Sequence, residues 1–313
     1  MSAYTCRKAF TETLLELART NRDILAITSD ARGSVTLNDF VDTLPKQFVE
    51  IGIAEQNAVG VAAGLATCGK IPFVCSPAPF LSARSFEQIK LDVAYSNTNV
   101  KLIGVSGGVS YGALGGSHQS LQDIAAMRAI SGLMVLLPCD ARQTRWFTKH
   151  IARITGPVYM RMGRNPVPDV YTDKTASFQI GVANCICNGD DLTIIATGEM
   201  VYHAVRAASK LKTSGVYARV LDMHTIKPLD EQAIVSAAME TGCILTVEEH
   251  SIFGGLGSAV AEVVTAKYPV PVRILGIPDT HVITGESPDV FAYYRLDANG
   301  IAEAATTMLA HKK

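Results

Sequence analysis

Short apolar runs alternate with segments of helical spacing along the first half of the chain. Apolar runs of this length, separated by helices, are typical of a mostly parallel sheet that is covered on both faces. The predicted strands are residues 23–28, 48–53, 71–75, 100–106, 134–138 and 158–162. The predicted helices are residues 7–20, 55–68, 83–95, 119–130 and 141–153.

The alternation stops after residue 162 and resumes near residue 192, which predicts two α/β domains. The intervening stretch contains prolines, aspartates and scattered polar residues, as expected for an interdomain crossing. We therefore expect a first domain over residues 1–165, a linker over 166–188 and a smaller second domain over 189–313. The chain of 313 residues is long enough for two such cores.

Composition excludes several classes of partner. The net charge is −1 and 48% of the residues are apolar, so a nucleic-acid or anionic-membrane surface is not indicated. The longest uncharged run of interest, residues 102–122, is too rich in glycine and serine for a membrane span. The first residues lack the apolar core of a signal peptide, and we expect a cytoplasmic protein.

A glycine-rich segment, residues 106–118, lies between a predicted strand and a predicted helix. It contains five glycines and ends in Ser117-His118. Ligands bind at the carboxyl ends of strands in α/β sheets, and helix N-termini favour anionic groups. The segment is either a binding loop for an anionic or polyhydroxylated ligand or a long surface loop.

Four segments, in order, resemble the transketolase family over roughly residues 5–305. They are Phe48–Asn57 with the string GIAEQN, Ser82–Ile89 preceded by Phe80, Gly115–Gln119 with Asp123–Ala125, and Val247–His250 with Gly254–Gly257. The resemblance implies a thiamine-diphosphate pyrimidine-binding domain followed by a transketolase C-terminal domain. The GIAEQN turn is the most specific of these signals, and the glycine run at 254–257 is weak by itself.

The resemblance assigns the cofactor contacts to Glu55 and Phe80. A carboxyl group hydrogen-bonded to the pyrimidine ring favours the imino tautomer that activates the cofactor, and Glu55 matches that position. By itself, Glu55 could equally be a carboxylate at a helix N-terminus. Phe80 matches the aromatic residue that packs on the aminopyrimidine, although it could also be a core residue. Pro77 stands where relatives often have another aromatic residue.

The resemblance likewise implies the substrate contacts. His118 matches the active-site histidine near the reacting carbonyl, and we expect it to be catalytic with Glu55. Arg7, Ser34 and Arg164 match the groups that bind the sugar phosphate, a role suited to guanidinium and hydroxyl donors. Two positions depart from the pattern: Ser106 replaces a histidine and Leu114 an aspartate. These departures leave the identity of the sugar open.

The Gly-Asp-Gly…Asn signature that holds Mg²⁺ and the diphosphate is absent from the sequence. The resemblance therefore implies an N-terminal partner chain that holds most of the Mg²⁺ and diphosphate contacts, in an α₂β₂ assembly outside which this chain is inactive. The implied reaction is transfer of a two-carbon ketol unit from a phosphorylated ketose to an aldose. Two alternatives stay open: the β subunit of a 2-oxo acid dehydrogenase, and a non-catalytic regulatory paralogue.

Overall fold

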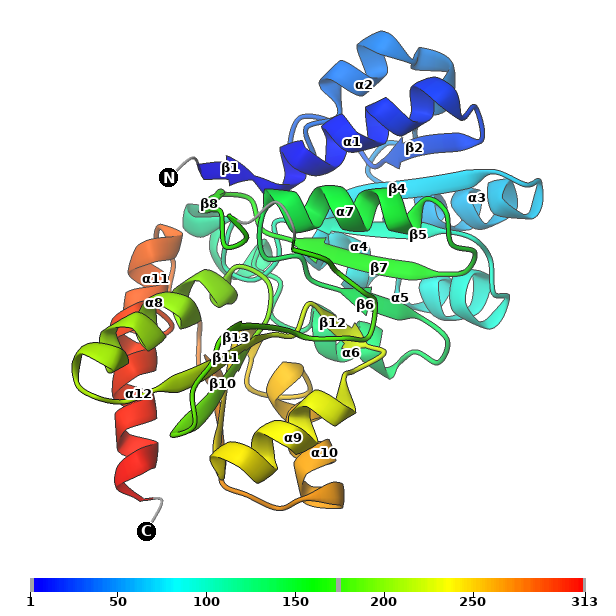
Figure 1. Cartoon of the computed structure of the whole chain (residues 1–313). Coiled ribbons are helices and arrows are strands. Elements are labelled where there is room, and N and C mark those ends of the chain that lie inside the picture. The colour runs from blue at the N-terminus through cyan, green and yellow to red at the C-terminus, as the bar shows by residue number, and fades with distance from the viewer. Residues whose placement is uncertain (1–2, 173–175, 312–313) are drawn as a thin grey trace.

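The computed structural model describes residues 3–172 and 176–311, which form two α/β domains (Figure 1). The sheet of the first domain has seven strands. Their order is β12 (Thr225–Lys227), β6 (Met134–Leu136), β7 (Val158–Met162), β5 (Lys101–Val105), β4 (Ile71–Pro77), β2 (Ile24–Thr28) and β3 (Phe48–Glu50). All neighbours are parallel except β12, which is antiparallel to β6. Central strands such as β2 and β5 are buried along their whole length, as their apolar runs predict.

Helices cover both faces of this sheet. One face packs on α1 (Cys6–Thr20), α2 (Asn38–Thr43) and α7 (Ala141–Ile151). The other packs on α3 (Glu55–Thr67), α4 (Ala78–Arg84), α5 (Phe86–Gln88), a π-helical segment (Ile89–Tyr95) and α6 (Asp123–Ala129). Two short 3₁₀ turns, Pro45–Gln47 and Gly112–Ser117, lie in the connections. The side chain of Asp140 caps α7 by accepting from the Gln143 amide.

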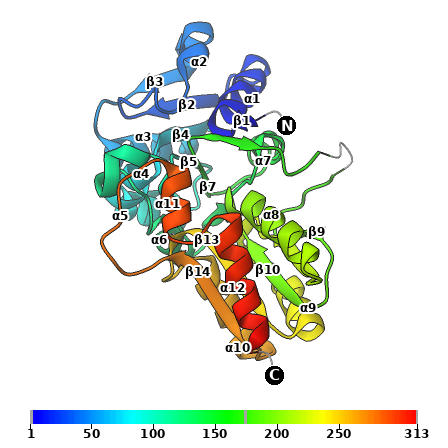
Figure 2. The same cartoon turned by 90° about the vertical axis from the view of Figure 1, so that its left-hand side faces the viewer.

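The second domain is built on a five-stranded sheet (Figure 2). Its order is β14 (Val272–Ile277), β13 (Ile244–Ser251), β10 (Leu192–Ala196), β11 (Ala218–Asp222) and β9 (Asn184–Cys187), with only β9 antiparallel. One face packs on α8 (Met200–Thr213), α11 (Ser287–Tyr293) and α12 (Ala298–Ala310). The other packs on α9 (Glu231–Thr241) and α10 (Leu256–Lys267).

The two domains are joined more closely than the linker prediction implies. The segment expected to be a linker contributes β8 (Pro166–Pro168), which pairs with β1 (Ala3–Thr5), and it also contributes β9. The second sheet therefore starts before residue 189. Strand β12, from the second half of the chain, is the outermost strand of the first sheet, next to β6. A single apolar cluster runs from α3 and α6 to α9 and α10, so the domains share buried surface.

Several predicted boundaries differ in the structure. The strand from residue 48 ends at Glu50, because Gly52 with a φ of 75° turns the chain before α3. The helix expected from residue 83 already begins at Ala78, where Pro79 in its first turn needs no backbone donor. Residues 119–122 precede α6, and Ser120 instead pairs with Gly108. Within the described ranges, no helix is both long and apolar enough to cross a membrane.

Candidate functional site

The predicted site residues gather at one edge of the first sheet. Carboxyl ends of neighbouring parallel strands meet at the same edge. The first turn of α1 reaches that edge as well, since Arg7 hydrogen-bonds the carbonyls of Ser34 after β2 and Arg164 after β7. The residues placed there are Arg7 in α1, Ser34 after β2, Glu55 after β3, Phe80 after β4, His118 after β5 and Arg164 after β7.

Glu55 is the first residue of α3, and its side chain is only 4% exposed. Its Oε1 accepts a hydrogen bond from Ser29 Oγ at 3.3 Å, and Ser29 Oγ lies 2.9 Å from Ser76 Oγ. Its Oε2 accepts from Arg84 Nη1 at 3.0 Å. One carboxylate oxygen therefore faces the buried Ser29, and the other faces an arginine whose side chain is 45% exposed.

His118 packs against two other rings, and Arg84 links one of them to this carboxylate. The His118 ring is edge-on to both Phe80 and Tyr111, with centroid distances of 5.1 Å in each case. His118 Nδ1 lies 2.9 Å from Ser117 Oγ, which orients the imidazole. The Arg84 guanidinium carbon lies 4.1 Å from the Phe80 ring centroid. The structure thus brings Phe80, His118 and Glu55 into one site through Arg84.

Tyr111 belongs to the site although the sequence analysis does not predict it. It is the only residue of the Phe, Tyr or Trp type in the glycine-rich segment 106–118, a signal that could have identified it. Its ring lies between His118 and Arg164, whose guanidinium carbon is 5.0 Å from the Tyr111 centroid. Tyr111 therefore fixes the spacing between the His118 imidazole and the Arg164 guanidinium.

Arg7 and Arg164 form a candidate anion site, although their contacts differ from the simple expectation. Arg7 donates through Nε to the Arg164 carbonyl at 3.1 Å and through Nη1 to the Ser34 carbonyl at 2.7 Å. Burial, and then the charge of Arg164, lower the pKa of Arg7. Arg164 Nη1 is buried and has no hydrogen-bond partner within residues 3–172 and 176–311. Two neighbouring cations with a spare buried donor favour an anionic ligand.

The departures from the family pattern lie in different surroundings. Ser106 is buried at the end of β5 with a φ of 61°, and its Oγ has no partner among the described residues. Leu114 is 54% exposed on the 3₁₀ turn of the glycine-rich segment. Pro77 is the buried last residue of β4. Of these three residues, only Ser106 has a buried side-chain polar atom that lacks a hydrogen-bond partner among the described residues.

The second domain holds the glycine-rich segment in place. Glu249 Oε1 accepts from the Val109 amide at 2.7 Å, and Gln119 Nε2 donates to the Ile283 carbonyl at 3.1 Å. Gly108 has a φ of 60°, and a Cβ there would come within 2.2 Å of Glu249 Cδ. The segment therefore requires glycine at this position because of its close packing against the second domain.

The glycine run at 254–257 has a structural role. The Glu248 carboxylate accepts from the amides of Leu256 and Gly257, both at 2.7 Å, and so holds the start of α10. Because Glu248 is fully buried, these hydrogen bonds satisfy a carboxyl that water cannot reach.

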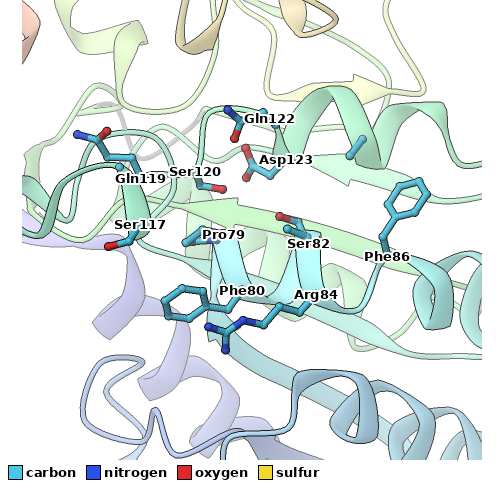
Figure 3. Close-up of a pocket in the computed structure, with 13 residues that line it drawn as sticks. Pro79, Phe80, Ser82, Arg84, Phe86, Ser117, Gln119, Ser120, Gln122 and Asp123 are labelled. Carbon is cyan, nitrogen blue, oxygen red and sulfur yellow. The ribbon is translucent and has the colours of Figure 1, made fainter. Parts of the chain in front are cut away.

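A cavity of about 450 Å³ opens between α4 and α6 beside Phe80 (Figure 3). Figure 3 shows Phe80, Arg84 and Ser117 on one side of it, opposite Gln122 and Asp123. A flat heteroaromatic ring fits a site with a partly exposed phenyl ring and a buried carboxylate near it. Within the described parts of the chain, no group of three or more His, Cys, Asp or Glu residues could hold a metal ion.

Known protein families and proteins match both domains of this chain. Residues 2–169 match the family model "Transketolase, pyrimidine binding domain", and residues 181–301 match "Transketolase, C-terminal domain". The chain is 59% identical over 300 residues to one of the subunits of an apulose-4-phosphate transketolase of Phocaeicola vulgatus, covering 96% of each. It is 39% identical over 299 residues to a 6-deoxy-6-sulfo-D-fructose transketolase subunit of a Clostridium species, covering 96% of this chain and 92% of the relative. A solved structure titled "Split gene transketolase, inactive beta4 tetramer" superposes with a TM-score of 0.89 at 39% identity over all of both chains.

Proposed function

We propose that this chain, which belongs to the transketolase family, is the C-terminal subunit of a two-chain, thiamine-diphosphate-dependent ketol transferase. Two relatives, one named as a subunit and the other as a split-gene transketolase, imply a partner chain. The proposed partner is an N-terminal chain that holds the diphosphate and Mg²⁺, and the proposed assembly is α₂β₂. The proposed reaction transfers a two-carbon ketol unit from a ketose to an aldose.

The observation that carries this proposal is the convergence of Glu55, Phe80 and His118 with the arginine pair at one sheet edge. Bound thiamine diphosphate supplies the nucleophilic carbon of the reaction. Glu55 would exchange a proton with the pyrimidine ring nitrogen, donating it as an acid and accepting the N–H hydrogen bond as a carboxylate, and Phe80 would provide the surface for that ring. His118 would donate or accept hydrogen bonds at the sugar hydroxyls, since its imidazole is partly exposed.

Arg7 and Arg164 bind the anionic end of the sugar. Their charges are close together, and Arg164 Nη1, which has no partner within the described residues, gives a donor for a phosphate or sulfonate oxygen. Tyr111 separates this anion site from His118, so the reacting carbonyl and the anion lie at two fixed points. A sugar phosphate of matching length would meet both.

For the donor we propose a modified ketose phosphate, with apulose 4-phosphate as the first candidate. The 59% identical relative is named for that substrate. The lost aspartate at Leu114 and histidine at Ser106 remove hydrogen-bonding groups that an ordinary ketose phosphate would use, and such losses change selectivity strongly. Leu114 is exposed, so a differently substituted sugar has room beside it.

Reconstitution with the cognate N-terminal chain tests the function. We expect the C-terminal chain alone to bind thiamine diphosphate and Mg²⁺ very weakly in calorimetry and to turn over no donor. The pair should bind the cofactor and transfer a ketol unit. Micromolar cofactor binding by the C-terminal chain alone would contradict the two-chain proposal, and a pair that binds cofactor without turnover on any donor would favour a regulatory role.

A donor panel tests the substrate. We expect the pair to use apulose 4-phosphate with a higher kcat/KM than xylulose 5-phosphate, and we expect Leu114→Asp to narrow that difference. The exposed Ala113→Asp variant is the matched control, because it adds the same charge one residue away. If wild type prefers xylulose 5-phosphate and Leu114→Asp does not improve it further, the substrate assignment is wrong.

A further inference from the structure

Arg84 contacts both residues of the proposed aminopyrimidine subsite, and we propose that it occupies that subsite as a stand-in until the cofactor is loaded. The inference rests on the proposed function. Arg84 lies within one of the segments that resemble the transketolase family, but the resemblance assigns it no role.

The first observation concerns the two oxygens of Glu55. Oε1 faces Ser29, which is itself bonded to Ser76, and both serines are buried. Oε2 carries the bond from Arg84, at 3.0 Å. Since the Ser29 side is closed, a ring nitrogen that approaches Glu55 from the accessible side has to take the position of Arg84.

The second observation concerns the ring of Phe80. The Arg84 guanidinium carbon lies 4.1 Å from its centroid, and Figure 3 shows the guanidinium against the phenyl ring. The His118 ring also packs against Phe80 in a T-shaped contact, with the ring centroids 5.1 Å apart. One face of the phenyl ring is therefore covered by the same group that pairs with Glu55.

The chemistry of the two occupants explains why one can replace the other. A guanidinium is flat, delocalised and lined with N–H donors, so it stacks on aromatic rings and hydrogen-bonds carboxylates, as an aminopyrimidine with a proton on its ring nitrogen does. While it stays there it keeps the buried carboxylate paired, which avoids the cost of an isolated buried charge. Its side chain is 45% exposed and lines the cavity of about 450 Å³, so it has room to leave.

The cofactor's pyrimidine ring therefore has to compete with the Arg84 guanidinium for Glu55 and Phe80. Each cofactor molecule that enters must displace one cation–π contact and one charged hydrogen bond made by Arg84. A variant without these contacts should bind the cofactor more tightly, because nothing has to be displaced. If Arg84 instead held the phosphates of the cofactor, its removal would have the opposite effect.

Isothermal titration calorimetry on the reconstituted pair tests this with thiamine diphosphate plus Mg²⁺, and with unphosphorylated thiamine. We expect Arg84→Gln to raise the affinity for thiamine diphosphate roughly 3- to 30-fold, the range for loss of one ring contact and one exposed ion pair. Thiamine should gain by a similar factor, since the competition involves only the pyrimidine subsite. Arg84→Lys, which keeps the charge without the flat group, should fall between wild type and Arg84→Gln.

The control is Lys90→Gln, which removes an exposed cation from the neighbouring π-helical segment and should leave both affinities unchanged. Unchanged or weaker cofactor binding by Arg84→Gln and Arg84→Lys would overturn the stand-in role. A gain for thiamine diphosphate without a gain for thiamine would also overturn it. Failure of the wild-type pair to bind thiamine diphosphate would instead refute the proposed function.

Discussion

At the edge of the first sheet, Arg7 and Arg164 lie together and contact carbonyl oxygens and an aromatic ring, whereas at the seam between the domains Arg161 is surrounded by acids. Arg161 Nε lies 3.1 Å from Asp123 Oδ2 and its Nη2 donates to the Glu249 carbonyl at 2.8 Å. Tyr159 completes the seam by donating to Asp123 at 2.7 Å. The two arginines at the sheet edge can therefore attract an anion, whereas the positive charge of Arg161 is already neutralised by the neighbouring acids.

The carboxyl groups at the sheet edge and at the seam differ in the same way. Glu55 at the sheet edge shares its charge with a partly exposed arginine that has room to move. At the seam, burial and the neighbouring Glu249 raise the pKa of Glu199 to about 8, and burial raises the pKa of Glu249 to about 7. Groups at the edge can exchange partners for a ligand, and groups at the seam fix the position of one domain on the other.

The largest effect on turnover should come from Glu55→Gln in the reconstituted pair. We expect kcat to fall by about a thousandfold, roughly 4 kcal/mol, because Gln has no carboxyl group to exchange a proton with the pyrimidine ring nitrogen. Thermal unfolding should change little, since the arginine left behind is partly exposed. Glu87→Gln, on the exposed surface of α5, is the control. A near-normal rate for Glu55→Gln would remove this residue from its proposed role.

The matching change at the seam is Arg161→Met. It leaves Asp123 and Glu249 buried without their cation, and we expect a loss of about 3–5 kcal/mol in the free energy of unfolding measured with urea. The exposed Arg153→Met should cost less than about 0.5 kcal/mol. If both variants lost the same small amount, the seam would not be what holds the domains together.

Arg7→Ala should act on substrate binding at the sheet edge. Loss of a charged hydrogen bond corresponds to about 1.5–3 kcal/mol, so we expect KM for a phosphorylated donor to rise roughly 10- to 150-fold. The neighbouring exposed Lys8→Ala should leave KM unchanged. An equal rise in KM for a donor without an anionic group would show that Arg7 does not bind the anion.

The smallest effect we expect is in the pH dependence of stability. The native state keeps a proton on Glu199 that the unfolded chain releases near the ordinary pKa of 4.5. This contribution is fully present below that value and is lost as the pH rises through about 8. Glu199→Gln should therefore unfold about 5 °C above wild type at pH 8.5, with little difference at pH 5.

Calorimetric scans at both pH values check this prediction, with the exposed Glu240→Gln as the control. Equal shifts of the unfolding temperature at pH 5 and pH 8.5 would mean that Glu199 does not titrate at the seam.

The sequence determined the two α/β domains, because the period of its apolar residues is a local property of each segment. It also indicated Glu55, Phe80 and His118 through short motifs, and the structure brings these residues together at one sheet edge. The family match shows the transketolase domains that the resemblance implied. The individual roles of the site residues stay predictions.

Only the tertiary structure decided which distant residues meet. The sequence assigns no role to Arg84 or Tyr111, and their part in the site follows from ring and carboxylate distances between segments that are separate in the sequence. Strand β12 joins the first sheet from the second half of the chain, a pairing that local periodicity cannot reveal. The seam likewise gathers Asp123, Arg161 and Glu249 from three elements, because buried charges are stabilised only by partners that folding brings within hydrogen-bond distance.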